Sequence, residues 1–392
     1  MGQIVAAMAT VHAPQLFTYP PSEDPAQLDA DIAAMRELGR TLDETKPDAA
    51  IVIGSDHLET FFLSAVPTFA IVGGERSRAA FARREYSLPT HALTEELLDK
   101  LVNRGFDLTY SQDAELGHAF AAVYEWVIEG RAIPVVPIFV NTYLPPLATA
   151  RRCAQLGEAI RDIVLASPYK VAIIASGGMS HYPGAWKYPQ PAYDFDWWAI
   201  AQMERGNHEA LLNLTSEQLD EVGNTEMLPW MVLFGAIGKQ PGELITYQPT
   251  WHHGHAVMRF IPNKKGVPTT PEPAPAWKFE SSGGYQFYRH PDPAVYRLNK
   301  VLFDLRFSQD LRLRLFENTK AVADEYGLNE KEAEVLETMK DETIDAVRSL
   351  KPHPLVAAGA HPLGMWMSIL VVQAEQRRLR AEKAKAAEQV KQ

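Results

Sequence analysis

Four of the twelve histidines stand where an α/β fold would open a pocket. His12 follows the apolar segment QIVAAMAT, His57 follows IVIGSD, and His181 follows KVAIIASGGMS. His118 lies in AELGHAFAA, after a glycine that could begin a helix. Ligand sites of α/β folds gather at the ends of strands. A single histidine there would usually be structural, but several that converge predict a catalytic or metal site, because packing gains nothing from an imidazole.

The carboxylate that could join them lies in GNTEMLPWMVLFGAIG, residues 223–238. Glu226 enters an otherwise apolar helix near its start, where Pro229 is tolerated. A buried glutamate needs hydrogen bonds, a partner charge or a metal, whereas an exposed one would only favour the helix dipole. Glu243, after a Pro-Gly turn, is the rival and looks exposed. Two neutral histidines and one carboxylate suit non-haem Fe(II), but the same ligands also suit zinc in a hydrolase.

Other catalytic motifs are missing from the sequence. It contains no HExxH, no GxSxG, no phosphate-binding loop and no dinucleotide fingerprint, which argues against a helical zinc protease, a nucleophile elbow and nucleotide cofactors. The single cysteine, Cys153, excludes an internal disulfide and a cysteine-rich metal centre. It lies in a helical pattern and is expected to be a small packed residue.

The elements that must position these residues alternate along the first two thirds of the chain. Apolar runs predict strands, and apolar residues recurring at three and four predict helices. The expected strands are 3–10, 48–56, 66–74, 132–140 and 170–178, and the expected helices are 25–45, 93–105 and 147–168. This alternation predicts an α/β domain over 1–262, with a mixed sheet flanked by helices. A Pro-rich linker is expected at 263–291, and a small all-α domain with a charged tail at 292–392.

Composition limits the class of protein. Hydrophobic residues make up 46% and charged residues 22%, the net charge is −11 and the pI is near 5.6. Broad attraction to nucleic acid or to an anionic membrane is therefore not expected. No apolar run is long enough to span a membrane, and the N-terminus lacks the basic flank of a signal peptide. A cytoplasmic protein is expected.

At this point the chain resembles a known family, the class III (LigB-type) extradiol ring-cleavage dioxygenases, especially protocatechuate 4,5-dioxygenases and gallate dioxygenases. The matching pieces are His12, the pair Asp56-His57, VPTFAIVGG at 66–74, FVNTYLPP at 139–146, GGMSH at 177–181 and NTEMLPWMVLFGA at 224–236. Residues 292–375 are similar, more weakly, to the small helical partner subunit of protocatechuate 4,5-dioxygenase. A large part followed by a small part in one chain is the arrangement of gallate dioxygenases.

The resemblance implies a LigB-like catalytic domain with a LigA-like helical cap, and an enzyme that opens a catechol-type ring with O2. The implied roles are Fe(II) ligation by His12, His57 and Glu226, acid/base catalysis by His181, a second active-site histidine at His118, and support from Asp56 behind the ligands. Fe(II) would be the only cofactor, and the partners would be a small aromatic substrate and O2.

The resemblance implies that residues 246–260, TYQPTWHHGHAVMRF, form the segment that contacts the ring substituent of the substrate. The expected substrate-binding residues are Thr250, Trp251, His252 and His253. Family members acting on benzoate-type catechols carry small hydroxyl residues there, and Ala13 also replaces a hydroxyl residue that often follows the first metal histidine. Three interpretations stay open: an imidazolium that holds a carboxylate, an imidazole that bonds a dihydroxypyridine, and histidines on the surface of a strand.

Two other functions are compatible with the same residues. A zinc-dependent hydrolase on this scaffold would use the same ligands, and a non-catalytic binding protein would be expected to have lost some of them. All the expected positions are filled, which favours an enzyme. A homodimer is expected, because the apolar face of PLGMWMSILVV, residues 362–372, should be buried.

Overall fold

The computed structural model forms two compact units. It describes residues 1–73, 76–78, 85–87, 91–114, 116–260, 276–280, 283–340 and 350–390. One unit comprises Met1–His181 with Gln190–Gln286, and the other comprises Tyr182–Pro189 with Phe287–Gln392. The predicted boundaries at 262 and 291 differ from this division. The predicted linker lies largely outside the described residues, since 261–275 and 281–282 are not among them.

The first unit is built on an eight-stranded sheet with the order β6-β3-β7-β2-β8-β1-β10-β9. These strands are β1 (Gln3–Thr10), β2 (Ala49–Ser55), β3 (Phe69–Val72), β6 (Thr109–Ser111), β7 (Val135–Val140), β8 (Lys170–Ser176), β9 (Gly242–Pro249) and β10 (Gly254–Phe260). The neighbours β7, β2, β8 and β1 are parallel, and β10 runs antiparallel to β1. The predicted mixed sheet is therefore confirmed. A separate pair joins β4 (Arg76–Arg78) to β5 (Glu85–Ser87).

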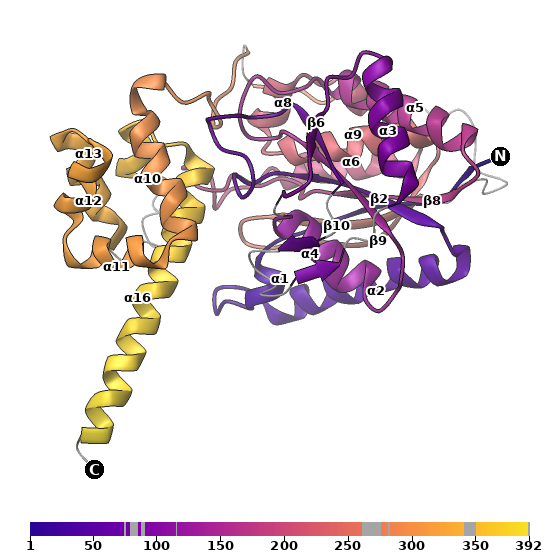
Figure 1. Cartoon of the computed structure of the whole chain (residues 1–392). Helices are drawn as coiled ribbons and strands as arrows, with labels where there is room; N and C mark the ends of the chain where they lie inside the picture. The colour runs from indigo at the N-terminus through magenta and orange to yellow at the C-terminus, as the bar shows by residue number, and fades with distance from the viewer. Residues whose placement is uncertain are drawn as a thin grey trace. The chain divides into compact units, whose positions relative to one another are not determined.

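Helices cover both faces of this sheet (Figure 1). They are α1 (Gln15–Thr18), α2 (Pro25–Thr45), α3 (Ala92–Asn103), α4 (His118–Val123), α5 (Ala150–Ala166), α6 (Tyr193–Glu204), α7 (His208–Leu212), α8 (Ser216–Glu221) and α9 (Leu228–Ile237), with a π-helical turn η1 (Tyr124–Ile128) and a 3-10 turn η2 (Thr225–Met227). Helices α2 and α4 pack on one face, and α3, α5 and α9 on the other. The central strands are continuously apolar because both of their faces are buried.

Every secondary-structure element described in the second unit is helical, as the sequence predicts. Its elements are η3 (Pro293–Val295), α10 (Tyr296–Phe307), α11 (Gln309–Glu317), α12 (Thr319–Tyr326), α13 (Glu330–Glu337), η4 (Thr338–Lys340), α15 (Pro354–Ala357) and α16 (Pro362–Val390). Met365, Ile369 and Val372 of α16 are buried in the core of this unit. The apolar face that led us to expect a homodimer is thus covered from within, and the homodimer stays a prediction. In the described ranges, no helix combines the length and the apolar character that a membrane span needs.

The packing of α5 against α9 fixes the segment that carries Glu226. Gly157 on α5 faces α9, and Gly235 on α9 faces α5. A Cβ atom at Gly157 would lie within 3.0 Å of the Val232 carbonyl oxygen, and one at Gly235 equally close to the Ala154 carbonyl oxygen. The two helices therefore approach each other through backbone atoms, which only glycine permits here.

We expect Gly157→Ala to lower the free energy of unfolding by about 1–3 kcal/mol, because overpacking forces the two helices apart. The loss should outweigh the roughly 1 kcal/mol by which alanine is the better helix former. Chemical denaturation measures the change. Glu158→Ala is the matched control, since Glu158 is exposed on the same helix, and its change should stay within about 0.5 kcal/mol. Equal stabilities of the two variants would contradict the close packing.

Candidate active site

The parallel strands bring the predicted histidines to one edge of the sheet. Strands β1, β8 and β2 are neighbours, so their carboxyl ends lie side by side. His12 and His57 each stand two residues past the end of a strand, and His181 stands five residues past β8. His118 begins α4 and joins the same edge, its ring centroid 4.0 Å from that of His57. All four side chains are buried.

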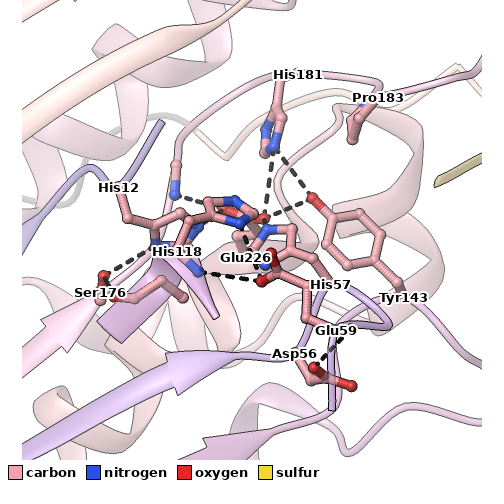
Figure 2. Close-up of polar contacts among 12 residues, drawn as sticks. His12, Asp56, His57, Glu59, His118, Tyr143, Ser176, His181, Pro183 and Glu226 are labelled. Carbon is pink, nitrogen blue, oxygen red and sulfur yellow. Dashed lines mark hydrogen bonds and ion pairs between the residues drawn. The ribbon is translucent and has the colours of Figure 1, made fainter. Parts of the chain in front are cut away.

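Glu226 is the carboxylate at the centre of this group (Figure 2). It lies in η2 and is fully buried. Its Oε1 atom is 2.5 Å from Nε2 of His57, and its Oε2 atom is 3.0 Å from Nε2 of His12. The backbone N–H of Gly178 donates to Oε2 over 2.7 Å. The rival carboxylate, Glu243, is exposed and pairs with Arg259 instead.

The hydrogen bonds behind His12 show that its Nε2 lone pair faces the centre. The Ser176 hydroxyl donates to the Ala119 carbonyl oxygen over 2.6 Å, so its oxygen accepts from Nδ1–H of His12 over 2.9 Å. Nε2 of His12 is close to Glu226, yet within the described part of the chain it forms no aligned hydrogen bond. A buried imidazole nitrogen and a carboxylate that face the same point without bonding each other fit a shared metal ion.

The protonation states favour ligation. Burial lowers the pKa of His12, and it lowers the pKa of His57 to about 4. Both imidazoles are therefore neutral at pH 7 and can offer a lone pair. Burial alone would raise the pKa of Glu226, but attraction to His12, His181 and His57, which become positively charged when they are protonated at acid pH, holds it well below its usual range. The site thus combines two neutral nitrogen donors with one carboxylate.

His118 offers a third nitrogen close to the same point. Donor atoms of His12, His57 and His118 all lie within 4.8 Å of one another. Oε2 of Glu59 accepts from both the backbone N–H and Nδ1 of His118, each over 3.1 Å. This carboxylate holds the ring so that Nε2 is the nitrogen left for the site. The sequence analysis missed Glu59, since no local pattern separates it from an exposed loop residue.

Tyr143 connects the carboxylate to His181, and it too was missed. Its hydroxyl donates to Oε1 of Glu226 over 2.6 Å and lies 3.1 Å from Nε2 of His181. Nδ1 of His181 lies 2.7 Å from the Met179 carbonyl oxygen and must donate to it, so Nε2 is again the nitrogen that faces inward. Tyr143 stands three residues past β7, so the strand-end rule that selected the histidines would have found it.

Asp56 contacts the backbone rather than an imidazole. It accepts from the N–H groups of Glu59, Thr60 and Phe61 over 3.0–3.1 Å, and burial raises its pKa to about 6. These bonds shape the turn that carries His57 and Glu59. The role of Asp56 in supporting the metal ligands stays a prediction. Its contacts show that it stabilises the turn.

Residues 252–255, where β10 begins, are buried beside His181. His252, His253 and His255 are each at most 3% exposed, so the interpretation as surface residues of a strand is wrong. The His253 ring stacks on that of His181 with centroids 3.8 Å apart. Nε2 of His252 and the Trp251 indole N–H both meet Oε1 of Glu23. Elsewhere in the segment, Nδ1 of His255 lies 2.7 Å from Asp31, and the Thr250 hydroxyl donates to the His253 carbonyl oxygen over 2.9 Å.

Comparison with known proteins identifies the class. A family model described as the catalytic LigB subunit of aromatic ring-opening dioxygenase matches residues 6–260, more than half of the chain. The chain therefore belongs to this family of ring-opening dioxygenases, as the sequence resemblance predicts. Dioxygenases of this family are metal-dependent, and the buried histidine cluster lies inside the matched residues.

Several curated relatives carry the name 2,3-dihydroxyphenylpropionate/2,3-dihydroxicinnamic acid 1,2-dioxygenase. The protein from Klebsiella pneumoniae subsp. pneumoniae is 32% identical over 164 residues, which is 41% of this chain and 52% of the relative. The protein from Comamonas testosteroni is 31% identical over 196 residues, 48% of this chain and 60% of the relative. The chain spans about half the length of these curated relatives. The predicted fusion of a large and a small part, as in gallate dioxygenases, stays a prediction.

The two possible ligand sets make different predictions. If Glu226 completes the centre, Glu226→Ala should lose at least 90% of the bound iron after anaerobic loading and desalting, whereas His118→Ala should keep most of it. His57→Ala, which removes a nitrogen common to both sets, should lose iron in either case. Elemental analysis of the purified proteins decides. Iron lost from His118→Ala but kept in Glu226→Ala would assign the centre to three histidines instead.

Proposed function

We propose that this protein is a non-haem Fe(II) extradiol dioxygenase that opens the ring of a catechol-type aromatic compound with O2. The observation that carries the proposal is the buried Glu226 carboxylate, held between Nε2 of His12 and Nε2 of His57. This is the two-histidine, one-carboxylate set of Fe(II) oxygenases, which leaves positions open for other ligands. Membership in the family of ring-opening dioxygenases supports it.

In this proposal, Fe(II) bound by His12, His57 and Glu226 would bring substrate and O2 together and pass electron density between them. The remaining chemistry belongs to side chains of the chain. Nε2 of His181 accepts the proton of a substrate hydroxyl and later returns it during ring opening. The Tyr143 hydroxyl lies 3.1 Å from that nitrogen and donates to Glu226. His118, held by Glu59, offers its inward nitrogen to a substrate hydroxyl or to oxygen.

For the substrate we propose a catechol with a polar side substituent. The curated relatives are named for 2,3-dihydroxyphenylpropionate and 2,3-dihydroxycinnamic acid, and the resemblance to protocatechuate and gallate dioxygenases also points to acidic catechols. Of the four residues that the resemblance places near the substituent, Thr250, Trp251, His252 and His253, we propose that His253 makes the direct contact. A dihydroxypyridine is the second candidate, because Nε2 of His253 is buried without a hydrogen-bond partner among the described residues and could bond a ring nitrogen.

Zinc-dependent hydrolysis is the competing reaction for the same donor atoms. It would need no oxygen, so oxygen uptake separates the two functions. The homodimer, the cytoplasmic location and the absence of nucleic-acid partners stay predictions. The LigA-like identity of the helical unit stays a prediction as well.

We expect anaerobically purified protein loaded with Fe(II) to consume oxygen with at least one catechol and to form a new absorbing product. The panel should contain protocatechuate, gallate, 2,3-dihydroxyphenylpropionate, plain catechol and dihydroxypyridines. His181→Ala should keep its iron but lose at least a hundredfold in kcat, because general acid–base catalysis contributes about 10²–10⁴-fold. Oxygen uptake by His181→Ala at the wild-type rate would remove this histidine from the mechanism. Hydrolysis without oxygen uptake would favour the zinc enzyme.

His253 and His252 should respond differently to truncation. His253→Ala should raise KM for the preferred substrate about two- to tenfold, as expected for one lost hydrogen bond. His252→Ala should chiefly lower the melting temperature, because it leaves the Glu23 carboxylate short of a buried partner. Steady-state kinetics for each substrate and thermal denaturation measure the two effects. An equal rise of KM in both variants would contradict this separation.

A further inference from the structure

One buried carboxylate outside the metal group ties together the segments that carry it. Asp196 lies in the first turn of α6 and is fully buried. Its Oδ1 atom accepts from the Ser180 backbone N–H over 3.0 Å and from Nδ2 of Asn224 over 3.1 Å. Its Oδ2 atom accepts from the Tyr247 hydroxyl over 2.7 Å and shares the Ser180 N–H over 3.2 Å. A carboxylate that is out of reach of solvent thus meets donors from three separate segments.

Each of these donors stands next to the proposed active site. Ser180 directly precedes His181, and Asn224 stands two residues before Glu226. Tyr247 belongs to β9, the strand paired with β10, before which His253 lies. The backbone N–H of His181 also donates to the Gly223 carbonyl oxygen over 3.0 Å, so the two segments are joined directly as well. The carboxylate of Asp196 joins all three segments through its hydrogen bonds.

The residues around Asp196 are closely packed and hydrogen-bonded to one another. A Cβ atom at Gly254 would lie within 3.0 Å of Oδ2 of Asp196 and of the Tyr247 hydroxyl, so a larger residue there would displace these two groups. Ser180 uses all its polar groups locally: its N–H bonds Asp196, its carbonyl oxygen accepts from Gly254, and its hydroxyl oxygen accepts from the N–H of Ala192. Several hydrogen bonds thus join the start of α6 to the loop that carries His181, and they restrict the movement of that loop.

We propose that Asp196 is a positioning residue that sets His181 at the correct distance from Glu226. Nε2 of His181 lies 3.5 Å from Oε1 of Glu226, and the Tyr143 hydroxyl lies within hydrogen-bond distance of both. Catalysis depends steeply on such geometry, since a displacement of about 1 Å can cost about 10²-fold in rate. The hydrogen bonds of Asp196 run to Ser180, Asn224 and Tyr247, which are not among the proposed metal ligands. The inference rests on the proposed function for its kinetic consequence, whereas the carboxylate contacts themselves do not.

The substitution Asp196→Asn tests this with little change in shape. An amide cannot accept from all three donors, because its own N–H2 group must replace one oxygen. Even if the amide N–H2 faces Tyr247, whose hydroxyl can turn to accept, the second contact of Ser180 N–H is lost. The remaining bonds then run to a neutral amide oxygen, which is a weaker acceptor than a carboxylate. Asp194→Asn is the matched control, since Asp194 is exposed two residues earlier on the same helix. Tyr247→Phe removes only one of the donors and should act in the same direction, more weakly.

Three quantities are measured on protein loaded anaerobically with Fe(II): iron content, anaerobic binding of 4-nitrocatechol, and kcat with the best catechol. The absorbance of 4-nitrocatechol reports the ionisation of its two hydroxyls, so it shows whether the bound probe has lost its protons. For Asp196→Asn we expect iron content and the probe's Kd within about threefold of wild type. We also expect a more protonated bound probe and a kcat at least tenfold lower. Asp194→Asn should match wild type in every measurement.

The outcomes separate a positioning role from a general structural one. A kcat within threefold of wild type at equal iron, or a loss that merely follows lost iron, would overturn the inference. If Asp196→Asn does not fold, Tyr247→Phe decides: a severalfold lower kcat with iron retained supports the role, and a wild-type kcat overturns it. If wild type itself consumes no oxygen with any catechol, the proposed function fails. The spectrum of bound 4-nitrocatechol then tests the positioning role by itself. A more protonated probe in Asp196→Asn would support the role, and identical spectra for wild type and Asp196→Asn would overturn it.

Discussion

The burial of one carboxylate governs the organisation of the first unit. Taking an ion out of water costs several kcal/mol unless partners replace its hydration. Glu226 is drawn inside because the helix that follows it, α9, is apolar on every side and packs against α5 and the sheet. Its partners then have to come from other elements, and they are supplied by the ends of β1 and β2, by the loop after β7 and by the Gly178 backbone.

The outer contacts of the imidazoles follow one rule. His12, His118 and His181 each have Nδ1 beside a protein oxygen, which belongs to Ser176, Glu59 and Met179 respectively. Binding one ring nitrogen fixes the tautomer and turns the other nitrogen inward. Three rings from three elements are thereby preset toward one point without relying on the metal to orient them.

The sequence predicted the parts that depend on local pattern. The strand at 3–10 and the helix at 25–45 match β1 and α2 to the residue, because their apolar spacing leaves one packing solution. Strand ends located His12, His57 and His181, a helix start located His118, and an apolar helix located Glu226. Glu59 and Asp196 could not be found this way, because their burial depends on chain segments that are far away in sequence. The Tyr182–Pro189 loop was also unforeseen, since its place in the second unit depends on contacts such as that of the Tyr182 ring with Phe287.

The contacts of His252 and His253 limit which substrate groups these two side chains could bind. Nε2 of His252 already faces Oε1 of Glu23 at 3.2 Å and the Gln15 amide at 3.4 Å, so a substrate carboxylate would have to compete with Glu23 for it. His253 has no such acidic partner among the described residues and lies against His181. Burial holds the pKa of His253 well below its usual value, so its imidazole is neutral at pH 7 and would meet a substrate in that form. A neutral ring can accept or donate one hydrogen bond, which suits a hydroxyl, carbonyl or ring nitrogen better than it suits an isolated carboxylate.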